Sequence, residues 1–460
     1  MFPYNIPPRA VGAEIRYERK RFSVYPLFIA SGEEVVDNHT NPKAQRNRSL
    51  SKKIAVMMIL AGVLVNAAPA YPEDAALRAK ADAYEDRLRP WHVPGMGGVV
   101  QVVYDSLDLT NVLFYKGQGD STFHTSMYLA AESFRYAVTG AADAQANAIA
   151  AVHTLQQHLL VTQTTGYISR YVGPIDVPYM LDYTGSDLVR YGQGLYLGKF
   201  WLGNTSSDQY VGWFFGMGVA YDLLDDQPTR DLIRSMVTEV IDKLRTHLWL
   251  IMDENGAPSP SAPNIDGAER MAFLLVAANV TGDPFYQQLY EQEFEAGKPM
   301  YPFWSFSYFN KYTDYFAFNL KHVNHYSMFR YEMDPDRRQF YLDNFSRDLV
   351  EWTHNAWFDY VWLHMIDANP DLDDVDAILA DDLNTLTLFP SPPHGDSHKD
   401  IPLLAIDPVS QVFVDIQNAL GLQDLLGFEL QTKEPHEIQN RCNVEFLWQR
   451  KPYLRHQQET

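Results

Sequence analysis

Four segments of the sequence place polar side chains at the start of a helix that is otherwise rich in Gly, Ala and aromatic residues. The segments read GQGDSTFHTSMY (117–128), GNTSSDQY (203–210), NIDGAER (264–270) and NLKHVNHYSM (319–328). If the four helices run in the same direction, their polar starts converge at one end of the protein. The residues concerned are Asp120 and His124, Asp208 and Gln209, Asp266, Glu269 and Arg270, and His322, Asn324 and His325.

Carboxyl groups dominate this set. Hydrolysis of a glycosidic bond requires two of them, one protonated to assist the leaving group and one ionised to activate water or attack carbon. The four catalytic candidates are Asp120, Asp208, Asp266 and Glu269. Asp208 is the best single candidate, because the apolar helix behind it would raise its pKa. The sequence does not identify which carboxyl group is its partner.

Each of these residues also has a structural interpretation. Asp at a helix start accepts hydrogen bonds from unpaired backbone N–H groups and complements the helix dipole. Asp120 and His124 are four residues apart and can pair on one helix face. His322 and His325 have the spacing of metal ligands, but no third ligand follows at a recognisable spacing, and we predict no metal and no other cofactor.

Aromatic residues form the second signal. Aromatic rings stack on the apolar faces of sugars, whereas carboxylates and amides bind the hydroxyl groups, as in clefts that combine apolar walls with a few polar groups. The alternative is a core that uses Tyr and Phe heavily. A uronate lyase or epimerase would instead use Tyr or His as base beside an Arg. The predicted substrate-binding residues are His124, Gln209, Trp213, Arg270, Trp304, Tyr308, His322, Asn324 and His325.

Helical periodicity organises the chain after Tyr71. Pairs of helices are joined by short turns that contain Gly, Asp or Pro, and Gly140 is a predicted C-cap. The first helix of each pair is apolar nearly all round and is predicted to be buried, whereas the second has a charged face and is predicted to meet solvent. The predicted helices are 72–88, a pair that begins near 120, is divided at Gly140 and ends at 160, then 208–224, 230–251, 266–280, 285–294, 319–332, a stretch to about 364, 371–388 and 408–424. Repeated buried and exposed helices indicate an inner and an outer ring.

Long loops precede the buried helices and are expected to lie over one end of this scaffold. They span 162–207, 253–265 and 296–318. Within the first, GYISRYV (166–172) and GLYLGKFWL (194–202) are predicted to pair as a small β-hairpin. We predict a single domain over 71–460.

The N-terminal region has the three-part pattern of a secretory signal over 46–70. A basic segment (46–53) precedes an apolar core (54–65) and a small-residue segment (66–70). This pattern predicts export to the periplasm or the exterior, with a signal anchor as the alternative. The apolar core is too short for a typical membrane span, so no stable span is expected after cleavage. Residues 1–45 are expected to be a disordered or non-native extension.

The composition excludes several classes of function. The net charge of −21 argues against nucleic acid as a partner, since phosphate binding needs surplus Lys and Arg. A single cysteine, Cys442, excludes an internal disulfide framework and a Cys-rich zinc site. The acidic stretch 367–382 lacks the glycine and the terminal Glu spacing of an EF-hand, and is interpreted as a solvated helix start.

The helix pairs, together with SSDQYVGWFFGMGVAYDLL and DSTFHTSMYLAAESFRYAVTG, resemble the six-hairpin (α/α)6-toroid glycosidase superfamily and its secreted bacterial members over roughly residues 72–430. The resemblance implies an all-α toroid and a carbohydrate substrate. Such toroids carry a Ser-Arg-Asp-Gln type turn before an inner helix, and here the turn reads Ser206, Ser207, Asp208, Gln209 without the Arg. Only Asp208 is carried over as a catalytic residue.

The leading hypothesis is therefore an exported (α/α)6 toroid that hydrolyses a glycosidic bond in a polysaccharide or oligosaccharide. Two alternatives remain open. One is a uronate polysaccharide lyase or epimerase in the same scaffold, and the other is a non-catalytic toroid that binds glycans or envelope partners. The sequence does not predict an oligomeric state.

Overall fold

A computed structural model describes residues 75–104, 111–177, 188–301, 315–344, 356–366 and 375–388. The chain divides into two compact units, Met1–Ala75 and Ala76–Thr460, and the elements described below lie in the second, with Ala75 at the boundary. Several predictions fall outside the described residues, namely the extension 1–45, the signal segment 46–70, the helix 408–424, Trp304 and Tyr308.

The described part of the chain is mostly helical, as predicted, and contains eleven α-helices. They are α2 (Ala75–His92), α3 (Ser121–Thr139), α4 (Ala142–Leu160), α5 (Ser207–Leu223), α6 (Gln227–Thr246), α7 (Gly267–Thr281), α8 (Pro284–Gly297), α10 (Tyr315–Tyr331), α11 (Pro335–Asn344), α13 (Ala356–Ile366) and α14 (Val375–Leu388).

One predicted helix boundary was wrong. The helix predicted over 230–251 ends at Thr246, because Leu248 and Trp249 have φ angles of 56° and 65°, which no α-helix accommodates. The stretch predicted to continue to about 364 includes α11 and α13, and residues 345–355 lie outside the described residues. Gly140 does end α3 in the left-handed conformation (φ 65°), and its N–H donates to the Tyr136 carbonyl at 2.7 Å.

The first helix of each pair is buried, as predicted. In α5 every residue from Gln209 to Tyr221 is buried, and this helix packs against α3, α7 and α10. Its partner α6 buries one face only, with side chains such as Ile233, Val237 and Leu244, and carries its charges on the other. The apolar helix of this pair is therefore buried in the core, and the amphipathic helix faces solvent on its charged side.

The buried helices run in the same direction. At their starts, the Phe123 N–H of α3 donates to Gln209 Oε1 of α5 at 3.0 Å. At their ends, Asp222 of α5 accepts hydrogen bonds from Asn279 of α7 at 2.8 Å and Arg330 of α10 at 2.7 Å. Contacts at both ends require α3, α5, α7 and α10 to be parallel, so their polar starts lie on one side.

Close packing accounts for the glycines of α5. A Cβ atom at Gly216 would lie 2.6 Å from the Ser126 carbonyl oxygen of α3, and one at Gly212 would lie 2.9 Å from the Cα atom of Phe123. Contacts this short with backbone atoms exclude any side chain, although glycine costs a helix about 1 kcal/mol relative to alanine. The α3–α5 interface thus depends on glycine.

Two small antiparallel sheets lie in the segments that precede α3 and α5. Strands β1 (Gln101–Tyr104) and β2 (Val112–Lys116), which the sequence analysis did not predict, form one sheet. In the other, β3 (Tyr171–Pro174) pairs with β5 (Lys199–Leu202), which confirms the predicted pairing of 166–172 with 194–202. A third strand, β4 (Val189–Tyr191), lies between β3 and β5 in the sequence and pairs with the other edge of β5. The two predicted segments therefore pair within a three-stranded sheet and do not form the predicted hairpin.

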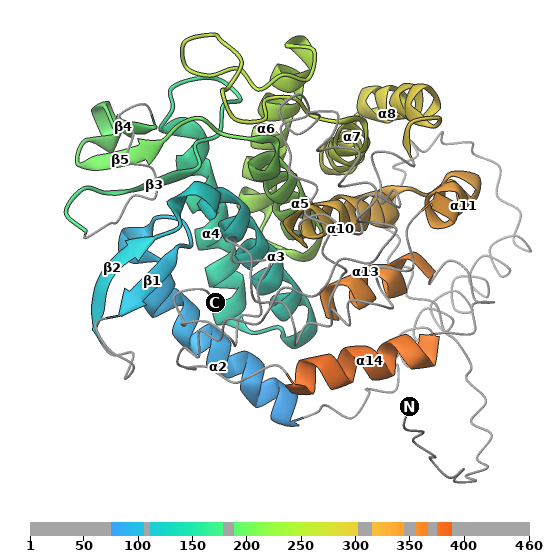
Figure 1. Ribbon diagram of the computed structural model, residues 1–460, viewed down its shortest axis with the longest axis horizontal. Helices are drawn as coiled ribbons and strands as arrows, with labels where there is room; N and C mark the ends of the chain where they lie inside the picture. The colour runs from blue at the N-terminus through green and yellow to red at the C-terminus, as the bar shows by residue number, and fades with distance from the viewer. Residues whose placement is uncertain are drawn as a thin grey trace, which may run out of the picture. The chain divides into compact units, whose positions relative to one another are not determined.

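The first and last described helices, α2 and α14, meet at their ends (Figure 1). Lys80 Nζ of α2 donates to the carbonyl oxygens of Leu386 and Thr387, both at 2.8 Å, in the last turn of α14. A cation at a helix C-terminus satisfies unpaired carbonyl groups and complements the helix dipole. Among the described residues, no helix combines the length and apolar character that crossing a membrane requires.

Candidate functional site

The starts of α3 and α5 are joined by Gln209. This side chain is fully buried, with its Oε1 accepting from the Phe123 N–H and its Nε2 donating to Asp120 Oδ1 at 3.2 Å. Two of the predicted residues, Asp120 and Gln209, are therefore in contact. Because every polar atom of the Gln209 amide faces protein, we assign it to the scaffold.

Arg170, which the sequence analysis missed, holds the loops ahead of both helices. Its guanidinium donates to the carbonyl oxygens of Asn204 and Gly119, both at 2.8 Å, and to Ser206 Oγ at 2.9 Å. Asp120 lies 3.8 Å from the same guanidinium. The sequence placed Arg170 in a predicted strand, and nothing in that pattern shows that its side chain reaches two helix starts.

At the start of α7, Asp266 and Glu269 form a capping box. Asp266 Oδ1 accepts from the Glu269 N–H at 2.8 Å, and Glu269 Oε2 accepts from the Asp266 N–H at 2.9 Å. The capping interpretation of Asp266 is therefore correct. It also fixes the Glu269 side chain, since one carboxyl oxygen is held by the backbone.

Glu269 has the properties of a proton donor. Burial is the main cause that raises its pKa, followed by the negative charge of Asp266 and more weakly by that of Asp208, and the result is a pKa of about 8. The residue is 6% exposed. Its second oxygen, Oε1, has no hydrogen-bond partner among the described residues and is not one of the solvent-inaccessible polar atoms, so solvent reaches it. Burial and the neighbouring carboxylates thus favour the protonated form of Glu269 at neutral pH.

Asp208 lies in the first turn of α5 and acts on this acid through its charge. The side chain is half-buried, and within the described ranges it forms no hydrogen bond and no ion pair. Its charge acts on Glu269, which places the two carboxyl groups near one another. The positive end of the α5 dipole favours an anion here without a side-chain partner.

Lys321 of α10 supplies the cation at this end, and the sequence analysis did not select it. Its Nζ donates to Asp266 Oδ2 at 2.6 Å, and its side chain is 17% exposed. Burial on its own would lower the pKa of Lys321, but the charges of Asp266 and Glu269 outweigh this and raise it. The ammonium therefore stays charged and joins the start of α7 to α10.

The predicted binding residues of α10 lie in the core. His325 is fully buried, its Nδ1–H donates to the Lys321 carbonyl at 2.6 Å, and its Nε2 accepts from the Tyr301 hydroxyl. Burial lowers the pKa of His325 to about 3. His322 is also buried and stacks on Phe358 with ring centroids 3.6 Å apart. We therefore assign both histidines to packing.

Four other predicted residues can also be placed. Trp213 and Asn324 are buried, and Trp213 packs edge-on against Phe214, so neither presents a surface to a substrate. His124 is half-buried, and burial lowers its pKa to about 4. Arg270 is held by other groups, because its Nε donates to the Ile265 carbonyl at 2.9 Å and its Nη1 lies 3.8 Å from Glu293.

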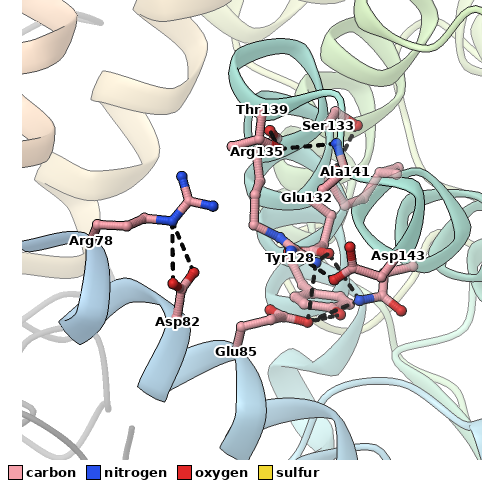
Figure 2. Close-up of polar contacts among 12 residues, drawn as sticks. Arg78, Asp82, Glu85, Tyr128, Glu132, Ser133, Arg135, Thr139, Ala141 and Asp143 are labelled. Atoms are coloured by element: carbon pink, nitrogen blue, oxygen red, sulfur yellow. Dashed lines mark hydrogen bonds and ion pairs between the residues drawn. The ribbon is translucent and has the colours of Figure 1, made fainter. Parts of the chain in front are cut away.

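The structure also contains a second pair of carboxyl groups, which no sequence pattern indicated (Figure 2). Glu85 of α2 accepts from the Tyr128 hydroxyl at 2.9 Å, and Glu132 of α3 binds Arg135 at 2.7 Å. Burial, followed by the charge of Glu132, raises the pKa of Glu85 to about 7. Asn147 of α4 donates to both carboxyl groups, at 2.9 and 3.0 Å. The pair joins three helices and is enclosed by protein donors, so we assign it to the scaffold.

The starts of the four buried helices are thus brought together in two linked groups. Asp120 and Gln209 form one, and Asp208, Asp266, Glu269 and Lys321 form the other. Within the described ranges, no three His, Cys, Asp or Glu side chains are arranged to hold a metal ion.

No protein-family model, no curated protein and no solved structure matches this chain. The chemistry of the site is therefore argued from its own residues.

Proposed function

We propose that the protein hydrolyses a glycosidic bond, with Glu269 as general acid and Asp208 as the ionised carboxyl group. The observation that carries the proposal is the raised pKa of Glu269, on which the charge of Asp208 also acts. Acid-assisted glycoside cleavage requires one protonated and one ionised carboxyl group.

In this reaction Glu269 Oε1 donates its proton to the glycosidic oxygen while the bond from that oxygen to the anomeric carbon breaks. Asp208 either removes a proton from the water that bonds to this carbon or first attacks the carbon itself. Water is consumed, and each product carries a hydroxyl group. The anomeric configuration of the first-formed product distinguishes the two routes.

Two further proposals complete this interpretation. The parallel buried helices and the contact of α2 with α14 support an (α/α)6 toroid, with the loops before α3 and α5 over the mouth that carries the acid pair. The signal-like pattern of residues 46–70 supports export, with a polysaccharide or oligosaccharide as substrate.

A uronate lyase is the second candidate, favoured by the Tyr301–His325 pair beside Lys321. Hydrolysis is preferred because Tyr301 and His325 are both fully buried, whereas Asp208 is only half-buried. A lyase product contains a double bond that absorbs at short ultraviolet wavelengths, and a hydrolase product does not.

The test is a screen of neutral and uronate-containing glycans and aryl glycosides with the wild type, Asp208→Asn and Glu269→Gln. We expect the wild type to release reducing ends from at least one substrate and each variant to lose roughly 10²–10⁴-fold in rate. Equal cleavage by the wild type and Asp208→Asn would show that the site is wrong. Binding of a glycan without cleavage would instead indicate the non-catalytic alternative.

A further inference from the structure

Lys321 occupies a position that is unfavourable for a cation. Most of its side chain is removed from water, which disfavours an ammonium group. Its retention in the charged form therefore depends on the carboxyl groups at the start of α7, Asp266 above all.

The contacts of Lys321 lead directly to Glu269. Lys321 Nζ holds Asp266 Oδ2, which leaves Asp266 Oδ1 to accept from the Glu269 N–H. The Asp266 N–H in turn holds Glu269 Oε2 and leaves Oε1 toward solvent. Two hydrogen-bonded steps thus separate the ammonium from the proton-carrying carboxyl group.

We propose that Lys321 is a positioning residue for the acid of the proposed reaction, and that through its ion pair with Asp266 it sets both the orientation and the protonation of Glu269. The inference rests on the proposed function for its catalytic meaning, whereas the coupling of Lys321 to Glu269 is measurable without a substrate.

The charges around Glu269 make the sign of this coupling definite. Asp266 and Asp208 both raise the pKa of Glu269, and Lys321 lowers it. His325 is neutral at neutral pH, because burial lowers its pKa, and Arg270 is directed toward the Ile265 carbonyl. The groups that face this region are Asp208 from α5, Asp266 and Arg270 from the start of α7, Lys321 and His325 from α10, and Tyr301. Lys321 is therefore the cation that offsets two negative charges.

Removal of Lys321 and removal of Asp266 should shift the titration midpoint of Glu269 in opposite directions. In Lys321→Met the titration midpoint of Glu269 should rise by about one pH unit or more, and in Asp266→Asn it should fall by a similar amount. Lys321→Arg retains the charge and should leave the midpoint close to that of the wild type. Asparagine is also a good N-cap, so Asp266→Asn retains the start of α7.

The experiment measures urea unfolding of the full chain across pH in each variant, with and without Glu269→Gln, so that the Glu269 titration is obtained by difference. Midpoints that rise in Lys321→Met, stay in Lys321→Arg and fall in Asp266→Asn support the proposal. A midpoint that is unchanged in both Lys321→Met and Asp266→Asn overturns it. If Lys321→Met does not fold, the result for Asp266→Asn decides.

With a cleavable substrate, the alkaline limb of the pH profile of kcat/KM should move by the same amounts, because activity requires protonated Glu269. A limb that stays in place while stability shifts would mean that Glu269 is not the acid. If the wild type cleaves no substrate in the screen, the proposed hydrolysis is overturned. If the Glu269 titration midpoints still shift as expected, the Lys321–Glu269 coupling is established.

Discussion

Helix α5 carries an aspartate at each end, and the two have opposite surroundings. Asp222, in the last turn, accepts hydrogen bonds from Asn279, Arg330 and Tyr331, at 2.8, 2.7 and 3.1 Å. Asp208, in the first turn, accepts none from the described residues. The helix dipole explains part of this difference, because it repels an anion at the C-terminus and attracts one at the N-terminus.

The comparison distinguishes a structural carboxylate from a reactive one. Asp222 has both oxygens occupied and joins the ends of α5, α7 and α10, so no coordination remains for a substrate. Asp208 has its oxygens open and lies beside Glu269, whose pKa is raised. Perturbed pKa values in solvent-reachable positions cluster at functional sites, although structural networks perturb them as well.

The largest expected difference between the two ends is in catalysis. With a substrate from the glycan screen, Asp208→Asn should lose roughly 10²–10⁴-fold in kcat/KM. Asp222→Asn should stay within about threefold when rates are normalised to folded protein, because this residue only supports the far ends of the helices. Circular dichroism establishes the folded fraction. Equal losses in the two variants would remove the distinction between the two ends.

In stability the order should be reversed. Asp222→Ala leaves the Arg330 guanidinium half-buried and unpaired and should lower the free energy of unfolding by about 2–4 kcal/mol. Asp208→Ala removes no hydrogen bond among the described residues, and its effect should stay within about 1 kcal/mol, the usual size of a dipole contribution. Urea unfolding at neutral pH measures both. A large loss in Asp208→Ala would indicate that Asp208 is structural.

Much of this arrangement could be predicted from the sequence, for identifiable reasons. Apolar helices with polar starts identified α3, α5, α7 and α10 as buried, since burial of a whole helix requires an apolar surface all round. The glycines of α5 allow close packing, as the contacts at Gly212 and Gly216 show. The predicted convergence of the helix starts depended on a common direction, and the contacts at Asp222 supply it.

The roles of individual polar residues could not be predicted. Gln209 has the appearance of a solvent-facing residue at a helix start, yet it is fully buried because Phe123 and Asp120 satisfy its amide. Lys321 was not predicted as a site residue, because a cation near a helix start matches no capping pattern. His322 and His325 were predicted to bind substrate because of their residue type, but tertiary packing buries both. Side-chain partners from distant segments decide such roles, and local spacing does not contain them.

The pH dependence of stability sharpens the comparison further. The pKa of Glu269 is about 8 in the folded protein against an ordinary value of 4.5, so its contribution to stability is complete below about pH 4.5 and is lost as the pH rises through 8. Between about pH 5 and about pH 9, the free energy of unfolding should therefore fall by about 1–3 kcal/mol more in the wild type than in Glu269→Gln. Asp222→Asn should retain the wild-type slope, since Asp222 does not face this acid. A wild-type slope in Glu269→Gln would contradict the raised pKa.

Glu85 provides the smallest and most selective test, because its pKa is also raised but its contacts are with α3 and α4 (Figure 2). Its stabilising contribution should be lost as the pH rises from about 4.5 through 7, and Glu85→Gln should be more stable than the wild type above that range by up to about 1 kcal/mol. The exposed Asp82 of the same helix pairs only with Arg78, and Asp82→Asn should change stability by no more than about 0.5 kcal/mol at any pH. Neither variant should alter kcat/KM. A loss of activity in Glu85→Gln alone would place the catalytic carboxyl groups at the α2–α3 contact, and Glu85, with Glu132, would then replace the Asp208–Glu269 pair as the acid pair of the protein.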